Sequence, residues 1–481
     1  MHEFDLDAKE VRRLGHLAAE LVAEHRAALL DRPVFGKVGD AAAAFDEPLP
    51  ETGQPIEQVL AEVRERILKH PFGNSHPRFF AFINATADPV GIVADYLAAS
   101  MNSNCWGGDH AAIHVERQVL RWLAAILGLP ETSEGILTSG GSMANFTALA
   151  TARRAKAPGV REDGFAGTEP LVVYVSEEVH NCVDKAIDLL GFGWKQLRKI
   201  ATDDRYRIRV DLLKQAIAED RRAGRKPAIV VGNAGTVNTG AIDPLDELAD
   251  LSAREGLWFH ADGAYGAMAT ISARLKPLFA GLERADSVAA DPHKWLYVPY
   301  EAGATLVREP GRMAEAFERK APYLVHDPDS PVRGPVSFNE RGPELSRGFK
   351  ALKVWMGLKR HGIRGYAAAV EHDVAMARTL ADAVLAHEDF ELLAPPVLSI
   401  VGFRYRPAGR KLDEPELDRL NRRIVNQLVG SGAFFLAPTL LKGRTAMRVA
   451  IVNFRTREED LSALVDEAAR AGRELLARFR V

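Results

Sequence analysis

The stretch Ser287-Val-Ala-Ala-Asp-Pro-His-Lys-Trp-Leu296 reads as a short buried strand that ends in the polar residues Asp291, His293 and Lys294. Burying a lysine ammonium group costs free energy or lowers the pKa of the amine, and an amine with a lowered pKa forms Schiff bases with carbonyls. Lys294 is therefore a candidate covalent anchor for an aldehyde cofactor. The alternative is a lysine that only extends from the strand end to the surface. The residues in the rest of the chain distinguish a cofactor anchor from a surface lysine.

Length and composition are those of a soluble globular protein with more than one domain. The chain has 481 residues, of which 47% are hydrophobic and 26% are charged. Its net charge of -3 lacks the basic surplus that binding to nucleic acid or to an anionic membrane requires. We therefore expect neither kind of partner.

Cysteine usage and the N-terminus favour a cytoplasmic protein. Cys105 and Cys182 are too few for a disulfide scaffold or a cysteine-rich metal site, which fits a reducing compartment. The first residues are acidic, whereas a signal peptide begins with basic and then apolar residues. No apolar run approaches the roughly 18 residues of a membrane span.

Short apolar runs alternate with helical stretches between about residues 110 and 310. This alternation predicts an α/β fold with a mainly parallel sheet that helices cover on both faces. Ligands of such sheets bind at the carboxyl ends of the strands, where this sequence places its polar residues. The strands are expected at residues 135–138, 170–175, 228–232, 257–261, 287–290 and 303–307, and the helices include 178–190, 211–223 and 244–255.

Three regions are expected along the chain. Residues 1–75 carry two amphipathic helices, over 6–30 and 56–69, and look like an extension that wraps another subunit. Residues 76–375 form the large domain, which ends in a long helix over 348–387 that Gly362 and Gly365 interrupt. Residues 376–481 form a small α+β domain with strands at 398–405, 433–437 and 447–452 and helices at 414–429 and 458–479.

One strand end carries Thr138-Ser-Gly-Gly-Ser-Met-Ala-Asn145, which opens a helix. Paired glycines allow a sharp turn and a close approach, and the free N–H groups at a helix start favour a phosphate. Ser142 either caps this helix or donates to the phosphate. A plain loop is the alternative for the whole stretch, which matches neither the dinucleotide nor the P-loop fingerprint.

Three further strand ends carry polar residues. In His260-Ala-Asp-Gly-Ala-Tyr-Gly266, a buried Asp262 needs a cationic partner, either a salt-bridge residue or the protonated ring nitrogen of a heterocyclic cofactor. Gly263 and Ala264 leave room for a flat ring. His180 begins a helix and either stacks on such a ring or is structural, and the segment 232–240 is rich in hydroxyl and amide groups.

A phosphate cradle, a stacking group, a buried acid and a Schiff-base lysine are together the parts that pyridoxal 5′-phosphate (PLP) needs. The pyridinium ring of PLP accepts electrons from a carbanion, and the acid keeps its nitrogen protonated. Competing sites find no support, because the sequence has no HExxH, no clustered metal ligands and no GxSxG. We expect PLP as the cofactor and no metal.

At these residues the sequence resembles the PLP-dependent group II amino-acid decarboxylases, which include the aromatic-L-amino-acid, glutamate and diaminobutyrate decarboxylases. The likeness rests on SGGS, His180, Asp262-Gly-Ala264 and Asp291-Pro-His-Lys-Trp295, and extends from about His76 to the C-terminus. The family implies a fold-type-I, aspartate-aminotransferase-like homodimer with its active site at the subunit interface. It also implies a small-molecule amino acid as substrate.

The resemblance implies a role for each matching residue. Lys294 is implied as the Schiff-base lysine, Asp262 at the pyridine nitrogen and His180 against the ring. A mobile loop of the family carries a tyrosine that protonates the substrate carbon after decarboxylation, and Tyr323 stands at that place, where relatives that make aldehydes tend to have phenylalanine. The implied cofactor contacts also include Gly141, Ser142, Thr236, Ala264, Asp291 and His293, and Arg347 is implied in the site as a structural or carboxylate contact.

The substrate is less determined than the reaction. Asn84, Asn102 and Asn104 lie where aromatic-specific relatives tend to have apolar residues, whereas Phe79, Phe80, Phe82 and Trp106 could line an apolar pocket. Among these residues we expect Phe82, Asn84 and Asn104 to contact the substrate. We expect decarboxylation of an L-amino acid, slightly favouring an aromatic one. The alternatives are a glutamate-like or diaminobutyrate decarboxylase, or a PLP-dependent aldehyde synthase or aminotransferase.

Overall fold

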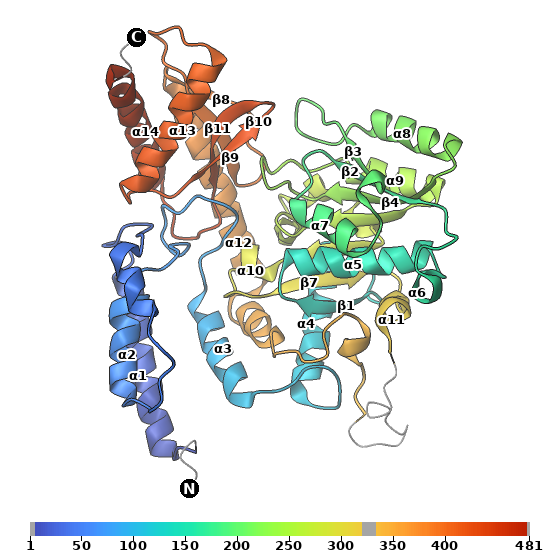
Figure 1. Ribbon diagram of the computed structural model, residues 1–481, viewed down its shortest axis with the longest axis horizontal. Helices are drawn as coiled ribbons and strands as arrows, with labels where there is room; N and C mark the ends of the chain where they lie inside the picture. Colours follow the sequence, from blue (N-terminus) through green and yellow to red (C-terminus); the bar gives the residue numbers. More distant parts are fainter. Residues whose placement is uncertain (1–4, 320–332, 479–481) are drawn as a thin grey trace.

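The computed structural model describes residues 5–319 and 333–478 and contains two β-sheets, each packed around a hydrophobic cluster of its own. Figure 1 shows the larger sheet with its helices on one side of the molecule and the smaller sheet with α13 and α14 above the N-terminal helices. The expected α/β class, with a mainly parallel large sheet and a smaller C-terminal α+β unit, is confirmed.

The large sheet has seven strands in the order β1-β7-β6-β5-β4-β2-β3, and only β7 runs antiparallel to its neighbours. Every residue of β1, β2, β5, β6 and β7 is buried, as expected for strands covered on both faces. The sequence did not predict β3, because this edge strand is a half-exposed Leu-Arg-Lys-Ile segment without an apolar run. The strands are β1 (Glu134–Thr138), β2 (Leu171–Ser176), β3 (Leu197–Ile200), β4 (Lys226–Asn233), β5 (Trp258–Asp262), β6 (Ser287–Ala290) and β7 (Gly303–Val307).

Helices connect these strands and bury their apolar sides against them. The helix α5 packs along β5, β6 and β7 and also against α7, whereas α8 and α9 pack on β4. These helices are α4 (Ala111–Leu127), α5 (Gly141–Lys156), α6 (Val160–Asp163), α7 (Asn181–Leu189), α8 (Val210–Arg222), α9 (Leu245–Glu255), α10 (Pro292–Trp295) and α11 (Arg312–Phe317).

The small sheet is antiparallel, in the order β10-β11-β9-β8. The helix α13 begins with a capping box in which Asp413 and Glu416 each bond to the other's backbone N–H. The strand expected at 433–437 begins only at Ala437, because the backbone of Phe435 bonds to the segment 78–80 instead of to a strand of this sheet. These elements are β8 (Phe390–Leu392), β9 (Ile400–Tyr405), β10 (Ala437–Leu441), β11 (Arg444–Ala450), α13 (Glu414–Gly430) and α14 (Glu458–Arg478).

The long helix α12 (Ala351–Ala386) joins the two halves of the molecule and is kinked at Gly362, which has φ 64° and ψ 173°. Val374 packs in the cluster of the large sheet, whereas Met376 packs in the cluster of the small sheet. We therefore propose the boundary at residue 375. One segment crosses that division, since Phe80 is buried in the small cluster and its backbone bonds to Phe435.

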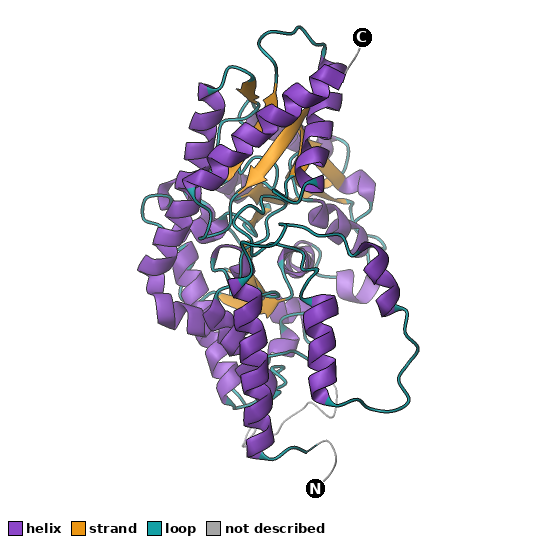
Figure 2. Ribbon diagram, turned by 90° about the vertical axis from the view of Figure 1, so that its left-hand side faces the viewer, coloured by secondary structure: helices purple, strands orange, loops and turns teal. Residues whose placement is uncertain are grey.

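The N-terminal region contributes α1 (Ala8–Ala27), α2 (Ile56–Glu62) and α3 (Pro89–Met101). The helix expected over 56–69 continues from α2 as a π-helical turn, Val63–Ile67. Leu21 is the one residue of α1 that is buried. Figure 1 shows α1 at the left-hand edge of the molecule, the side that faces the viewer in Figure 2. Among the described residues, no helix is both long and apolar enough to cross a membrane.

Candidate active site

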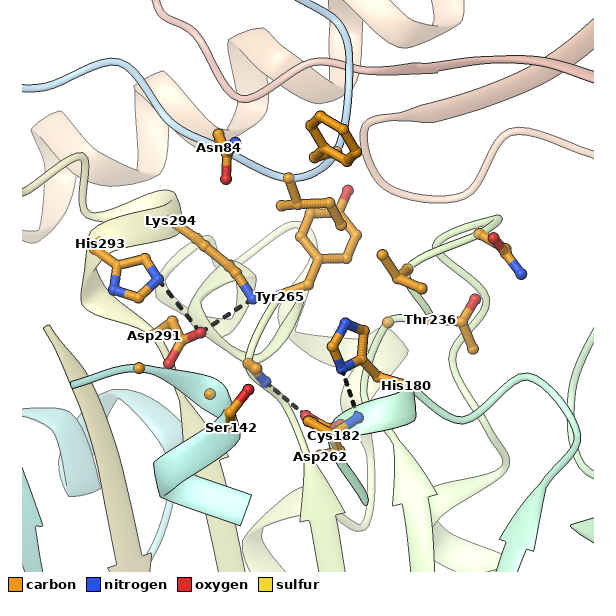
Figure 3. A pocket seen from close by; sticks show the side chains of 18 of the residues that line it. Asn84, Ser142, His180, Cys182, Thr236, Asp262, Tyr265, Asp291, His293 and Lys294 are labelled. Carbon is orange, nitrogen blue, oxygen red and sulfur yellow. Dashed lines mark hydrogen bonds and ion pairs between the residues drawn. The ribbon is translucent and has the colours of Figure 1, made fainter. Parts of the chain in front are cut away.

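A cavity of about 540 Å³ opens where the chain leaves the carboxyl ends of β4, β5 and β6. Further parts of its wall come from the start of α5, from His180, from the segment around Phe82 and from the start of β10, so both sheets contribute (Figure 3). The structure brings these sequence-predicted residues to its lining: Phe82, Asn84, Gly141, Ser142, His180, Thr236, Asp262, Ala264, Asp291, His293 and Lys294.

Lys294 lies in the short helix α10, directly after β6. Its side chain is 19% exposed, and its Nζ lies 3.0 Å from Oδ2 of Asp291. Asp291 is almost fully buried, and its Oδ1 has no hydrogen-bond partner among the described residues. The amine therefore points into the cavity and compensates a buried carboxylate (Figure 3), instead of extending to the surface.

His293 supports the same corner of the cavity. Its Nδ1 accepts a hydrogen bond of 3.1 Å from the backbone N–H of Ala302, and its Nε2 lies 3.5 Å from Asp291. Burial lowers the pKa of His293 to about 4, although the Asp291 carboxylate acts in the opposite direction. The imidazole is therefore neutral at physiological pH and can donate from Nε2.

The first turn of α5 forms the floor of the cavity beneath Lys294. Gly140 is the N-cap residue, with φ 149°, and no side chain caps this helix. A Cβ atom on Gly141 would lie 2.8 Å from Oδ2 of Asp291 and 2.9 Å from Cβ of Ala264, so a side chain does not fit there. Since Gly140 is the cap residue, Ser142 lies inside the first turn and does not cap the helix, and the uncapped backbone N–H groups remain available to an anion.

Asp262 and His180 face the middle of the cavity. Asp262 ends β5, and its Oδ1 accepts a bond of 3.2 Å from the backbone N–H of Ala264. His180 is the N-cap of α7, and its Nδ1 accepts a bond of 3.2 Å from the N–H of Cys182 (Figure 3). Because burial lowers the pKa of His180, its ring is neutral and carries its proton on Nε2. Nearby, the hydroxyls of Thr236 and Thr239 lie 3.0 Å apart.

The structure does not bring Asn104 and Arg347 to this cavity. Arg347 is buried and pairs with Glu116 at 2.6 Å, and it also donates to the carbonyls of Cys105 and Leu137 at 2.8 Å each. Asn104 accepts from the backbone N–H of Arg347 at 3.0 Å. Both residues hold α4, β1 and the segment before α4 together. The Tyr323 prediction lies outside the described residues.

Only one of the four predicted aromatic residues lines the cavity. Phe82 does so, whereas Phe80 is buried in the small cluster and Phe79 stacks on Phe435 at 5.0 Å. Trp106 is not part of the lining either. This segment pairs with the small domain at Phe435, a contact between distant residues that the sequence pattern could not indicate.

The sequence did not single out Tyr300 or Arg448 as site residues. The hydroxyl of Tyr300 donates to Oδ1 of Asn84 at 2.7 Å, and its ring lies 4.5 Å from that of His293. Arg448 donates to the carbonyls of Val237, at 2.8 Å, and Phe82, at 3.1 Å, and its burial lowers the pKa to about 10. Tyr300 follows Lys294 by six residues and could have been suspected, whereas only the fold brings Arg448 to the site.

Comparison with known proteins agrees with this geometry. Residues 39–406 match the model of the pyridoxal-dependent decarboxylase conserved domain. The chain belongs to this decarboxylase family. It is a PLP-dependent carboxy-lyase that acts on an amino acid.

Individual relatives span nearly the whole decarboxylase. The aromatic-L-amino-acid decarboxylase of Bacillus atrophaeus is 37% identical over 95% of this chain and 94% of that protein. The phenylacetaldehyde synthase of Arabidopsis thaliana is 28% identical over 93% of this chain and 92% of that protein. A crystal structure of Oryza sativa TDC with PLP and tryptamine has a TM-score of 0.91 and 27% identity, covering 98% of this chain and 99% of that chain.

The cavity of this decarboxylase fits PLP. The uncapped start of α5 suits a phosphate, and the contacts at Gly141 show that only a residue without a side chain leaves room there. Among the described residues, Asp262 forms no ion pair, so its carboxylate is available to a protonated ring nitrogen. Lys294 supplies an amine at the opposite side.

The buried carboxylate of Asp373 accepts hydrogen bonds from residues at the end of the helix of Lys294. Oδ2 of Asp373, on α12, accepts bonds from Trp295 Nε1 at 3.0 Å and from the Tyr297 hydroxyl at 2.7 Å. Burial raises the pKa of Asp373 to about 7, although these two hydrogen bonds and one from the backbone of Asn453 lower it.

Replacing Asp373 with asparagine is expected to change how stability depends on pH. Between about pH 4, where an unfolded aspartate ionises, and about pH 7, the folded protein keeps a proton that the unfolded chain has lost. The wild type therefore loses up to roughly 1.4 kcal/mol of stability per pH unit across this window. Asparagine resembles the neutral acid and does not ionise, so Asp373→Asn lacks this loss. The unfolding free energy of the variant should therefore rise relative to that of the wild type between pH 5 and pH 7.5. A difference independent of pH contradicts the assignment.

Removing one partner of the Arg347–Glu116 pair is expected to destabilise the decarboxylase by about 3–5 kcal/mol, because it leaves a buried charge without compensation. Chemical denaturation of Arg347→Met and Glu116→Gln measures this loss. The double variant should lose less than the sum of the single variants. If Arg347→Met instead keeps its stability and only raises KM, Arg347 contacts the substrate.

Proposed function

We propose that this enzyme removes the α-carboxylate of an aromatic L-amino acid and releases the corresponding amine and CO2. The observation that carries the proposal is the convergence of Lys294, Asp262, His180 and the start of α5 on one cavity. The names of the relatives support an aromatic substrate, since a decarboxylase of such amino acids is the more similar of the two curated relatives described above.

Each residue has a proposed task. Lys294 holds the cofactor covalently, Asp262 keeps its ring nitrogen protonated, and His180 lies against its ring. Gly141, Ser142 and His293 bind its phosphate, and Thr236, Ala264 and Asp291 complete the cofactor contacts. When bound, PLP accepts the electron pair that the departing carboxylate leaves behind. Tyr323 then delivers a proton to the α-carbon, which makes the product an amine.

The polar groups of the wall support an apolar substrate side chain over an acidic one. Arg448 is 4% exposed, and it donates its hydrogen bonds to the carbonyls of Val237 and Phe82. A side-chain carboxylate would have to compete with these bonds to pair with it. The amide oxygen of Asn84 is likewise engaged by Tyr300. Phe82 offers a ring at the mouth of the cavity, where its side chain is 48% exposed.

A second candidate function is aldehyde formation on the same cofactor. The 28% identical phenylacetaldehyde synthase favours this possibility, whereas Tyr323 favours simple decarboxylation. Glutamate, 2,4-diaminobutyrate and transamination remain the further alternatives, because this wall also contains Asn84, Asn238 and Thr439.

An amino-acid panel tests the proposal. The purified enzyme is incubated with L-tryptophan, L-phenylalanine, L-tyrosine, L-glutamate and L-2,4-diaminobutyrate, and CO2, amine and aldehyde are measured separately. We expect CO2 and amine in equal amounts, with the highest kcat/KM for one of the aromatic substrates. CO2 accompanied by aldehyde would instead favour the second candidate, and no CO2 from any substrate would refute decarboxylation.

We also propose a cytoplasmic homodimer with α1 and α3 at the subunit contact. The apolar side chains of Val11 on α1 and of Val93, Tyr96 and Leu97 on α3 are 45–56% exposed in the single chain. A second copy would remove this surface from water. Light scattering on the wild type and on Leu97→Glu tests the contact, and a wild-type monomer contradicts it.

A further inference from the structure

A chain of buried side chains lies below the cavity and ends at its phosphate-binding floor. The indole Nε1 of Trp258 donates to the hydroxyl of Ser287 at 2.8 Å, and that hydroxyl lies 2.9 Å from Nδ1 of His260. Nε2 of His260 lies 2.7 Å from Oδ1 of Asn145, whose amide nitrogen donates to the carbonyl of Gly141 at 2.9 Å. The chain thus connects β5 and β6 to the first turn of α5.

The Gly141 end of this chain determines the direction of the hydrogen bonds at His260. A carbonyl can only accept, so the Gly141 carbonyl takes the amide nitrogen of Asn145, which leaves Oδ1 to accept from Nε2 of His260. A neutral His260 then has an unprotonated Nδ1, which accepts from the Ser287 hydroxyl, and that hydroxyl in turn accepts from the indole N–H of Trp258. The proton of a neutral His260 therefore lies on Nε2.

Burial supports this neutral state. His260 and Asn145 have no measurable exposure, and burial lowers the pKa of His260 to about 4, although the nearby Asp262 carboxylate and the Ser287 backbone raise it. Asn145 also reaches the helix of His180, because its amide nitrogen lies 3.6 Å from Sγ of Cys182. Burial raises the pKa of that thiol to about 12, so it stays uncharged.

We propose that Asn145 and His260 are positioning residues for the cofactor phosphate. The Nε2–H tautomer of His260 holds the amide of Asn145 in one orientation, and Asn145 holds the carbonyl of Gly141. This carbonyl belongs to the turn whose N–H groups face the cavity, so the amide fixes the direction in which that turn presents them. None of these side chains needs to contact the substrate.

The proposal predicts a loss of affinity that depends on the phosphate group. Full-length apoenzyme is titrated with PLP and with pyridoxal, which lacks the phosphate, and the absorption of the lysine-bound cofactor is measured. Asn145→Ala should raise the Kd of PLP about tenfold or more, because buried partners lose their bonds, and should change the Kd of pyridoxal much less. The ratio of the two dissociation constants therefore falls.

Thr151→Ala is the matched control. Thr151 is buried in the same helix and donates to the carbonyl of Thr147 at 2.9 Å, but it takes no part in the chain below the cavity. We expect it to leave the ratio unchanged. Equal losses of PLP and pyridoxal affinity in Asn145→Ala would mean a merely structural role, and an unchanged Kd for PLP would likewise overturn the proposal.

The tautomer gives a second test that does not require a variant of Asn145. In the 15N-histidine-labelled holoenzyme, His260 should show a protonated Nε2 and an unprotonated Nδ1 from pH 5 to pH 9. Its signals are assigned from their shift in Ser287→Ala, which removes the hydroxyl bonded to Nδ1. A protonated Nδ1, or a His260 that titrates within this range, would overturn the assignment.

Discussion

Lys294→Arg is expected to form no amine from any substrate and to show no absorption from lysine-bound cofactor. A guanidinium group stays protonated and cannot form a Schiff base with an aldehyde. It can still pair with Asp291, whose Oδ2 lies 3.0 Å from the wild-type Nζ. Loss of activity should therefore come without a large loss of stability. The measurement combines product analysis, the visible spectrum and a denaturation curve.

The choice of arginine and of a control matters for this test. Lys294→Ala would leave the buried Asp291 without its cation, and a failure to fold would then be confused with a failure to react. Lys353→Arg is the matched control, since Lys353 is also buried and pairs with Asp95 at 3.2 Å, away from the cavity. It should keep its activity. Amine formation by Lys294→Arg would show that another residue anchors the cofactor.

The sequence predicts the large sheet well because fully buried strands have a simple signature. Continuous apolar runs mark β2, β4 and β6, and the polar residues at their ends follow from the rule that ligands bind there. These strand ends then converge because parallel neighbours end at the same edge. Nine of the predicted contacts line the cavity for this reason, among them Lys294 and Asp262, whereas Phe82 and Asn84 come from the segment before α3.

The remaining part of the site depends on contacts between distant segments. Arg448 reaches the cavity because β11 bonds to the segment around Phe82, at Phe80 through its backbone and at Phe82 through Arg448 itself. Asn104 was expected to contact the substrate and Arg347 to be a structural or carboxylate contact in the site, but both lie away from the cavity, where Arg347 pairs with Glu116 at 2.6 Å. The sequence alone does not distinguish an arginine that binds a ligand from an arginine that pairs with a carboxylate of the same protein.

Tyr323→Phe is expected to lower the rate of amine formation by about 10²- to 10⁴-fold, the usual contribution of a general acid. The residue lies outside the described part of the chain, and its task is inferred from the resemblance alone. Binding of the cofactor should not change, since Lys294, Asp262 and the start of α5 are intact. Amine, aldehyde and CO2 are measured together with the cofactor spectrum.

The products of Tyr323→Phe separate proton delivery from substrate binding. If the phenol protonates the α-carbon, its loss leaves the electron pair without a proton donor. Dissolved O2 can then oxidise the α-carbon and is reduced to H2O2, the nitrogen leaves as ammonia, and the share of aldehyde among the products should rise. Tyr300→Phe is the comparison, because its hydroxyl lies in the cavity and donates to Asn84 at 2.7 Å. Loss of that bond should raise KM and leave the product an amine. Aldehyde from Tyr300→Phe, with unchanged amine from Tyr323→Phe, would assign the proton donor to Tyr300.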